Sequence, residues 1–172
     1  MKKFVLTLIL SLFALLFGCD APAPSANLPE SEINRPDDFS FSLVWGVYGI
    51  SYYNSESCSL VKTTDATNPE DYVSTMRLSS EDLDEIYAKI SELDMDSYPE
   101  KYDPFDNVMS SPSQTIILTC GDNKIVCENI CLGYGSNNKK GQKFLDTVKF
   151  IIDKVTATEE WQSFPEYEFF YD

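Results

Sequence analysis

A stretch of alternating residues near position 40 constrains the fold of this chain most strongly. In "FSFSLVWGVYG", residues 39–49, a large apolar side chain occupies every second position from Phe39 to Val47. Successive side chains of a β-strand point to opposite faces, so this period of two predicts a strand with one strongly apolar face. The apolar face has to be covered by another layer of the protein.

The rest of the chain supplies further strands and two amphipathic helices. We expect strands at 50–53, 58–64, 72–78, 115–120 and 125–134, and helices at 78–96, 139–155 and 159–164. Ser79 and Thr158 are suited to cap the first and last helices, and "GDNK" at 121–124 is expected to form a hairpin turn. The order predicts an α+β fold, an antiparallel β-sheet built from hairpins with two main helices packed on one face.

The N-terminal segment has the pattern of an export signal. Lys2 and Lys3 precede an apolar run, residues 4–17, that is shorter than the roughly 20 residues needed to span a bilayer. Gly18 and Cys19 then resemble the end of a bacterial lipobox, in which diacylglycerol is attached to the cysteine thiol and the chain is cut before it. A plain signal peptide is the alternative reading.

These features predict three parts of the chain. Residues 1–18 are the lipoprotein signal peptide, 19–37 are the lipidated Cys19 with a flexible tether, and 38–172 form a single globular α+β domain. The tether contains four prolines and almost no large apolar residue, so it cannot build a core. We expect the protein at the cell membrane, lipid-anchored on the extracytoplasmic face.

Charge and composition exclude several classes of function. Removal of residues 1–18 leaves 11 basic and 28 acidic residues, a net charge of −17. Such a chain is repelled by nucleic acids. The sequence contains no histidine, which rules out Ser-His-Asp and Cys-His nucleophilic sites and histidine-ligated metals. No motif indicates a cofactor, and the carboxylate-rich segment 94–107 lacks the glycine and final glutamate of an EF-hand loop, so no metal site is predicted.

Four cysteines follow the lipidation site. In an exported protein Cys58, Cys120, Cys127 and Cys131 are either free or disulfide-bonded. With "GDNK" as the turn, Cys120 pairs opposite Ile125, and Cys120, Cys127 and Cys131 share one face of the hairpin. A diagonal Cys120–Cys127 bridge and buried free thiols both remain open.

A small group of lysines stands out in this acidic chain. Lys139, Lys140 and Lys143 lie at the start of the second main helix, where backbone N–H groups favour anions. They are a candidate patch for an anion or a partner. Ordinary surface lysines are the alternative, and the order of residues is not that of a phosphate-binding loop.

Three segments carry a resemblance to a known group of proteins. "FSFSLVWGVYGISYYNS", "LVKTTDATNPEDY" and "ATEEWQSFPEYEFFYD" resemble a family of small, uncharacterised, lipid-anchored or secreted proteins of Gram-positive bacteria. The resemblance spans nearly all of residues 38–172. It implies one compact domain outside the membrane and transfers no catalytic residue.

Two hypotheses for function follow from the sequence. The first is a non-enzymatic domain, held to the membrane by the lipid on Cys19, that binds an envelope protein or a wall component. The alternative is a small surface hydrolase, or a subunit of one, that uses Asp and Glu carboxylates; a two-lobed solute-binding protein needs a longer chain. Candidate contact residues for binding are the aromatic side chains Tyr52, Tyr53, Tyr167, Phe169, Phe170 and Tyr171. Burial in the core is the alternative for most of them.

Overall fold

The fold was analysed in a computed structural model of the 172-residue chain. The structure describes residues 34–46, 51–63, 71–105, 114–130 and 133–166. All of them belong to one compact unit, Ile33–Asp172. Cys19, Cys131 and the aromatic residues after position 166 lie outside the described ranges.

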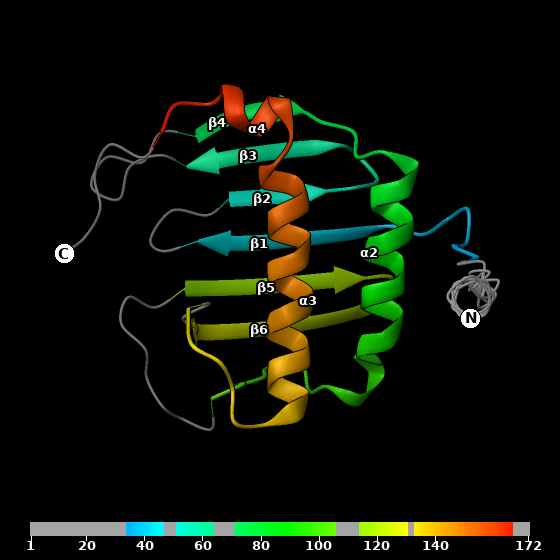
Figure 1. The fold of residues 1–172 in the computed structure, drawn as a ribbon, viewed down its shortest axis with the longest axis vertical. Helices are drawn as coiled ribbons and strands as arrows, with labels where there is room; N and C mark the ends of the chain where they lie inside the picture. Colours follow the sequence, from blue (N-terminus) through cyan, green and yellow to red (C-terminus); the bar gives the residue numbers. More distant parts are fainter. Residues whose placement is uncertain (1–33, 47–50, 64–70, 106–113, 131–132, 167–172) are drawn as a thin grey trace, which may run out of the picture. The chain divides into compact units, whose positions relative to one another are not determined.

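Six antiparallel strands form a single sheet. The strands are β1 (Phe41–Gly46), β2 (Ser51–Asn54), β3 (Ser59–Thr63), β4 (Asp71–Thr75), β5 (Gln114–Cys120) and β6 (Asn123–Ile130). Their order in the sheet is β4-β3-β2-β1-β5-β6, so β1 is an inner strand that pairs with β2 on one side and β5 on the other. β4 and β6 form the two edges (Figure 1).

The helices form the second layer. They are α2 (Ser80–Leu93), the 3₁₀ turn η1 (Met95–Ser97), α3 (Lys139–Thr156) and α4 (Glu159–Ser163). The hydroxyl oxygens of Ser79 and Thr158 accept the N–H groups of Asp82 and Trp161, as expected for N-caps. In Figure 1, α2 and α3 run across the strands on the same side of the sheet.

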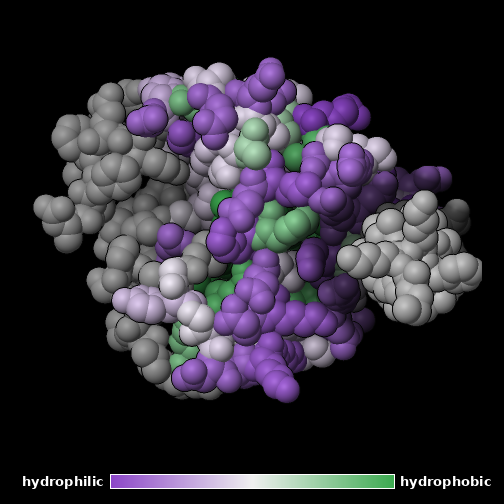
Figure 2. Space-filling view, viewed as in Figure 1, coloured by the Kyte–Doolittle hydropathy of each residue, from purple (hydrophilic) through white to green (hydrophobic). Residues whose placement is uncertain are grey.

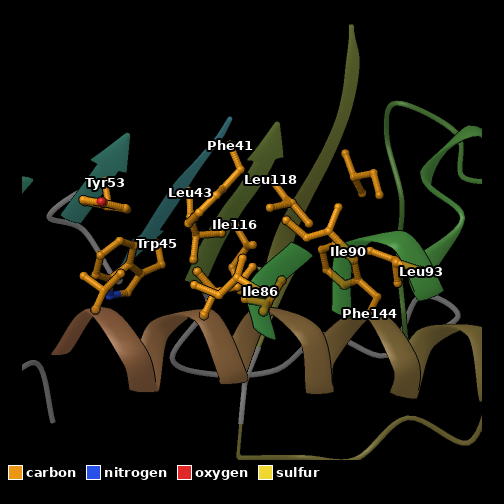
Figure 3. Packing of buried hydrophobic residues seen from close by; sticks show 14 of the residues in the cluster. Phe41, Leu43, Trp45, Tyr53, Ile86, Ile90, Leu93, Ile116, Leu118 and Phe144 are labelled. Atoms are coloured by element: carbon orange, nitrogen blue, oxygen red, sulfur yellow. The ribbon is translucent and has the colours of Figure 1, made fainter. Parts of the chain in front are cut away.

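Burial follows the alternation of the strands closely. Phe41, Leu43 and Trp45 of β1 are buried, and the residues between them are half-buried. Figure 3 shows these side chains pointing into the layer between the sheet and the helices, where the side chains of Ile86 on α2 and Phe144 on α3 also lie. One face of the sheet therefore packs against the helices to form the core. The α+β fold, with an antiparallel sheet and two main helices on one face, is the predicted one.

The β5–β6 hairpin corrects one detail of the sequence analysis. Cys120 pairs with Asn123, and Ile125 lies opposite Leu118, so the turn is two residues long and not four. Gly121 makes this possible, because its φ of 56° suits the first central position of a tight II′ turn. Even-numbered residues of β5 still pair with odd-numbered residues of β6 around the turn, as in the predicted hairpin. Cys120 and Cys127 therefore still share a face.

The segment after α2 has a role that the sequence did not indicate. Lys101 forms an isolated parallel bridge with Val126. Val126 N donates to Glu100 O at 2.6 Å, and Tyr102 N donates to Val126 O at 2.9 Å. This short segment therefore covers part of the outer edge of β6.

Ion pairs join α2 to its neighbours. Lys154 Nζ of α3 lies 2.7 Å from Asp82 Oδ1 and 2.5 Å from Glu85 Oε2. Arg35 Nε, near the point where the chain enters the domain, lies 2.7 Å from Asp84 Oδ1. In the described ranges, no helix combines the length and the hydropathy required to cross a bilayer.

The Lys154 pairs lead to a prediction about stability. The hydrogen bond from Lys154 is the main cause that lowers the pKa of Asp82, and the one to Asp82 is the main cause that raises the pKa of Lys154. Because both side chains are partly exposed, we expect Lys154→Met to lower the free energy of unfolding by only about 0.5–1 kcal/mol at pH 7.

The pH dependence has a defined sign. The contribution of Asp82 is complete above its ordinary pKa of 3.8 and is lost as the pH falls through the lowered folded-state value. Urea unfolding of the wild type and of Lys154→Met is therefore expected to show the difference in unfolding free energy at pH 7. Most of this difference is expected to be lost near about pH 2. Lys149→Met is the matched control, because it removes the same charge from a pair exposed at both ends. An equal loss of unfolding free energy in Lys154→Met and Lys149→Met would contradict the prediction.

Candidate binding face

The face of the sheet that points away from the helices carries an ordered set of side chains. The strand register aligns six apolar residues, one from each strand, in a continuous row. This outer apolar row consists of Val73, Val61, Tyr52, Val44, Ile117 and Val126. At about 4.8 Å between neighbouring strands it extends over roughly 24 Å.

A second row runs parallel to the first, and on each strand its residue is two positions away from the residue of the first row. This outer polar row consists of Thr75, Ser59, Asn54, Ser42, Thr119 and Lys124. The two rows are linked at their centre, because Asn54 Nδ2 donates to Tyr52 Oη at 3.0 Å. Asn54 Oδ1 in turn accepts the N–H groups of Glu56 and Ser57, so the turn after β2 helps to orient Asn54 and, through it, the Tyr52 hydroxyl.

The exposure of the outer apolar row differs from that of the inner face. Val73 is 68% exposed, and the other five residues of the row are half-buried. By contrast, Leu43, Leu60 and Leu118, which point to the helices, are fully buried. The buried hydrophobic side chains of α2, α3 and α4 all belong to the core on that inner side. No described helix therefore contributes its buried side chains to the outer face.

Charge is distributed unevenly between the two sides of the domain. Figure 2 shows that hydrophilic side chains cover most of the side that carries α2 and α3. On the outer face, the described outward-pointing residues of the inner strands β1, β2, β3 and β5 include no charged residue. Among the described strand residues of this face, charges occur only on the edge strands, as with Asp71 on β4 and Lys124 on β6. An uncharged centre with an aromatic residue is typical of the core of a binding surface.

The aromatic residues singled out from the sequence separate into two roles. Tyr53 is 1% exposed and belongs to the core, where burial raises its pKa to about 12. Its neighbour Tyr52 lies on the outer face at the middle of the apolar row. Of the described candidates, only Tyr52 is therefore placed to contact a partner.

The three lysines of the candidate patch are near one another, but two of them are engaged. Lys140 Nζ donates to Ser97 O and lies 4.2 Å from the centre of the Tyr98 ring. Lys143 Nζ donates to Glu92 O in the last turn of α2. A cation bound to carbonyls at the C-terminal end of a helix stabilises that end. Lys143 thus joins α3 to the end of α2, Lys140 joins it to the 3₁₀ turn η1 that follows, and Lys139 is exposed.

The described carboxylates form no arrangement typical of a hydrolase. A catalytic acid usually has a carboxyl group in a buried or apolar position. None of the Asp and Glu side chains in the described ranges is buried. Asp82 and Glu85, which do converge, share the ammonium group of Lys154. Within the same ranges, no group of three metal-binding side chains comes together.

Comparison with known proteins adds no assignment. No protein-family model matches the sequence, and no curated protein matches it either. The outer face is therefore identified from its geometry alone.

Three of the cysteines are described, and all three are free thiols. Cys58 and Cys127 are buried, and Cys120 is half-buried at the end of β5. Cys127 lies opposite Ile116 on the inner face, and burial raises the pKa of its thiol to about 12. Only the thiolate is nucleophilic, so Cys127 acts as a small apolar side chain of the core.

This environment predicts how Cys127 reacts. With iodoacetamide at about pH 8, we expect Cys127 to remain unmodified in the folded protein and to be alkylated fully in urea. Peptide mass spectrometry measures both states, and Cys120 in the same digest is the internal control because its side chain is partly exposed. Alkylation of Cys127 at the rate of Cys120 in the native protein would show that the core around it is open.

Proposed function

We propose that the protein is a lipid-anchored extracytoplasmic domain that binds an envelope protein or a wall component through the outer face of its sheet, without catalysis. The observation that carries the binding role is the uncharged centre of this face, organised around Tyr52 in a chain with a net charge of −15. Aromatic residues are enriched and charged residues depleted at the core of binding surfaces. The anchor is supported by the lipobox-like segment that ends at Cys19.

The entry point of the chain is consistent with a tethered domain. Arg35 donates to both Asp84 and Ser80, so the described part of the chain is attached to α2 from this residue onward. Arg35 is the sixteenth residue after Cys19, and a chain of that length spans at most about 55 Å. A reach of this length would allow the outer face to meet a partner in the envelope.

The anchor is tested by the intact mass of the protein extracted from membranes. We expect a chain that begins at Cys19 and carries a diacylglycerol or fully acylated cysteine, and we expect Cys19→Ala to lose both the lipid mass and membrane retention. The two acyl chains of a diacylglycerol are expected to hold the protein at the membrane, because one acyl chain alone binds only marginally. An unmodified wild-type chain released to the medium would overturn the anchor while leaving the binding face to be tested separately.

The binding face is tested by site-specific photo-crosslinking in intact cells. A photoreactive amino acid at position 52 is expected to form defined adducts with a protein or with wall fragments, and one at Lys149, an exposed position of α3, is not. The additional change Val44→Lys is expected to reduce the adducts at least about tenfold, because it buries an unpaired charge in the interface. Identical adducts from positions 52 and 149, or no adducts from position 52, would contradict the proposal.

A further inference from the structure

The two edges of the sheet are treated differently by the chain. The outer edge of β6 is partly covered by the segment around Lys101, which exchanges two backbone hydrogen bonds with Val126. Among the described residues, no strand or bridge pairs with the outer edge of β4. An uncovered edge presents unpaired backbone groups that can pair with another strand.

The direction of the backbone groups of β4 follows from its pairing with β3. Met76 N donates to Cys58 O at 2.8 Å, and the register then places Ser74 opposite Leu60. In an antiparallel ladder, alternate residues direct their N–H and C=O groups to the same neighbour. Because Met76 and Ser74 are directed to β3, the N–H and C=O groups of Val73 are directed to the open edge.

β4 has few of the features that usually protect an edge strand. Its sequence, "DYVST", contains no lysine, no proline and no bulge, and its one charged residue, Asp71, lies at the start of the strand, where its carboxylate accepts the Thr63 hydroxyl. Val73 is 68% exposed at the middle of the strand and forms the end of the outer apolar row. The edge therefore offers hydrogen bonds and an apolar contact at the same point.

We propose that β4 pairs with β4 of a second copy of this chain, antiparallel, across a two-fold axis at Val73. In this register Val73 lies opposite Val73 of the other copy and exchanges both backbone hydrogen bonds with it. Asp71 lies opposite Thr75, a carboxylate facing a hydroxyl, so no like charges meet. The same strand thus supplies both halves of a self-complementary contact, as a two-fold interface requires.

The pairing also extends a feature that is already present in one copy. The outer apolar row ends at Val73 on β4, so pairing at Val73 joins the rows of the two copies into one. The most exposed apolar side chain of the row becomes covered by its own equivalent. A five-residue strand buries less area than the roughly 1,200 Å² of a standard stable interface, so we expect a reversible dimer.

Disulfide trapping in the full-length protein tests this register. Paired residues of this type have Cα atoms about 5.5 Å apart, within the range that a disulfide bridges. We expect Val73→Cys to give at least about tenfold more covalent dimer under mild oxidation than Thr75→Cys, whose equivalents are roughly 13 Å apart along the strands. A mixture of Asp71→Cys and Thr75→Cys chains is expected to form the mixed dimer, and the wild type measures the background from the native cysteines.

A second variant separates pairing from folding. Val73→Pro removes an N–H group that is directed to the open edge and not to β3, so the fold is retained. In chains that also carry Asp71→Cys or Thr75→Cys, it is expected to abolish the mixed dimer with unchanged far-ultraviolet circular dichroism. Four outcomes would each overturn the proposal. Two concern the register: equal amounts of covalent dimer from positions 73 and 75, or covalent dimers of each single-cysteine variant with itself at all three positions, as in parallel strands. The other two are adducts with another protein in place of the dimer, and no dimer above background. None of these outcomes depends on the lipid or on the ligand of the outer face.

Discussion

The burial of only one face of the sheet is the constraint on which the rest of this structure depends. Leu43 and Ile116 of the inner strands are fully buried, together with Ile86 of α2 and Val148 of α3. A slip of one residue in β1, β2, β3, β5 or β6 would move buried side chains out of the core. The core therefore determines the register of these five strands, and β4, which has no buried residue, is aligned by its pairing with β3. Together these registers align the two rows on the outer face. The outer face is ordered because the inner face is packed.

Much of the architecture could be predicted because several local signals agree. The alternation from Phe39 onward is strong enough to define β1, and the helices combine a regular apolar stripe with the caps Ser79 and Thr158. The length of the β5–β6 turn could not be predicted in the same way. Four consecutive residues are suited to a turn there, and only the backbone conformation of Gly121 selects between them. The bridge at Lys101 has no periodic pattern, so nothing in its sequence identified it.

The candidate site was less accessible to sequence reasoning than the fold. Tyr52 could be singled out as an aromatic residue, but the row around it joins strands that are far apart in the chain, such as Val44 and Ile117. Their alignment depends on long-range pairing, which a single sequence does not encode locally. The lysines at the start of α3 illustrate the opposite case. Their spacing was suited to an anion, yet Lys143 binds a carbonyl at the end of α2, a partner 51 residues away in the chain.

The position of β1 in the sheet determines how the domain responds to mechanical load. A domain attached through its N-terminal side receives force first at Arg35, which is held by Asp84, and then along β1. Since β1 lies between β2 and β5, pulling along it loads the hydrogen bonds on both of its sides together. An edge strand would instead detach along one row of bonds. If the proposed anchor holds the domain from its N-terminal side, the strand nearest to that anchor is thus one of the hardest to extract.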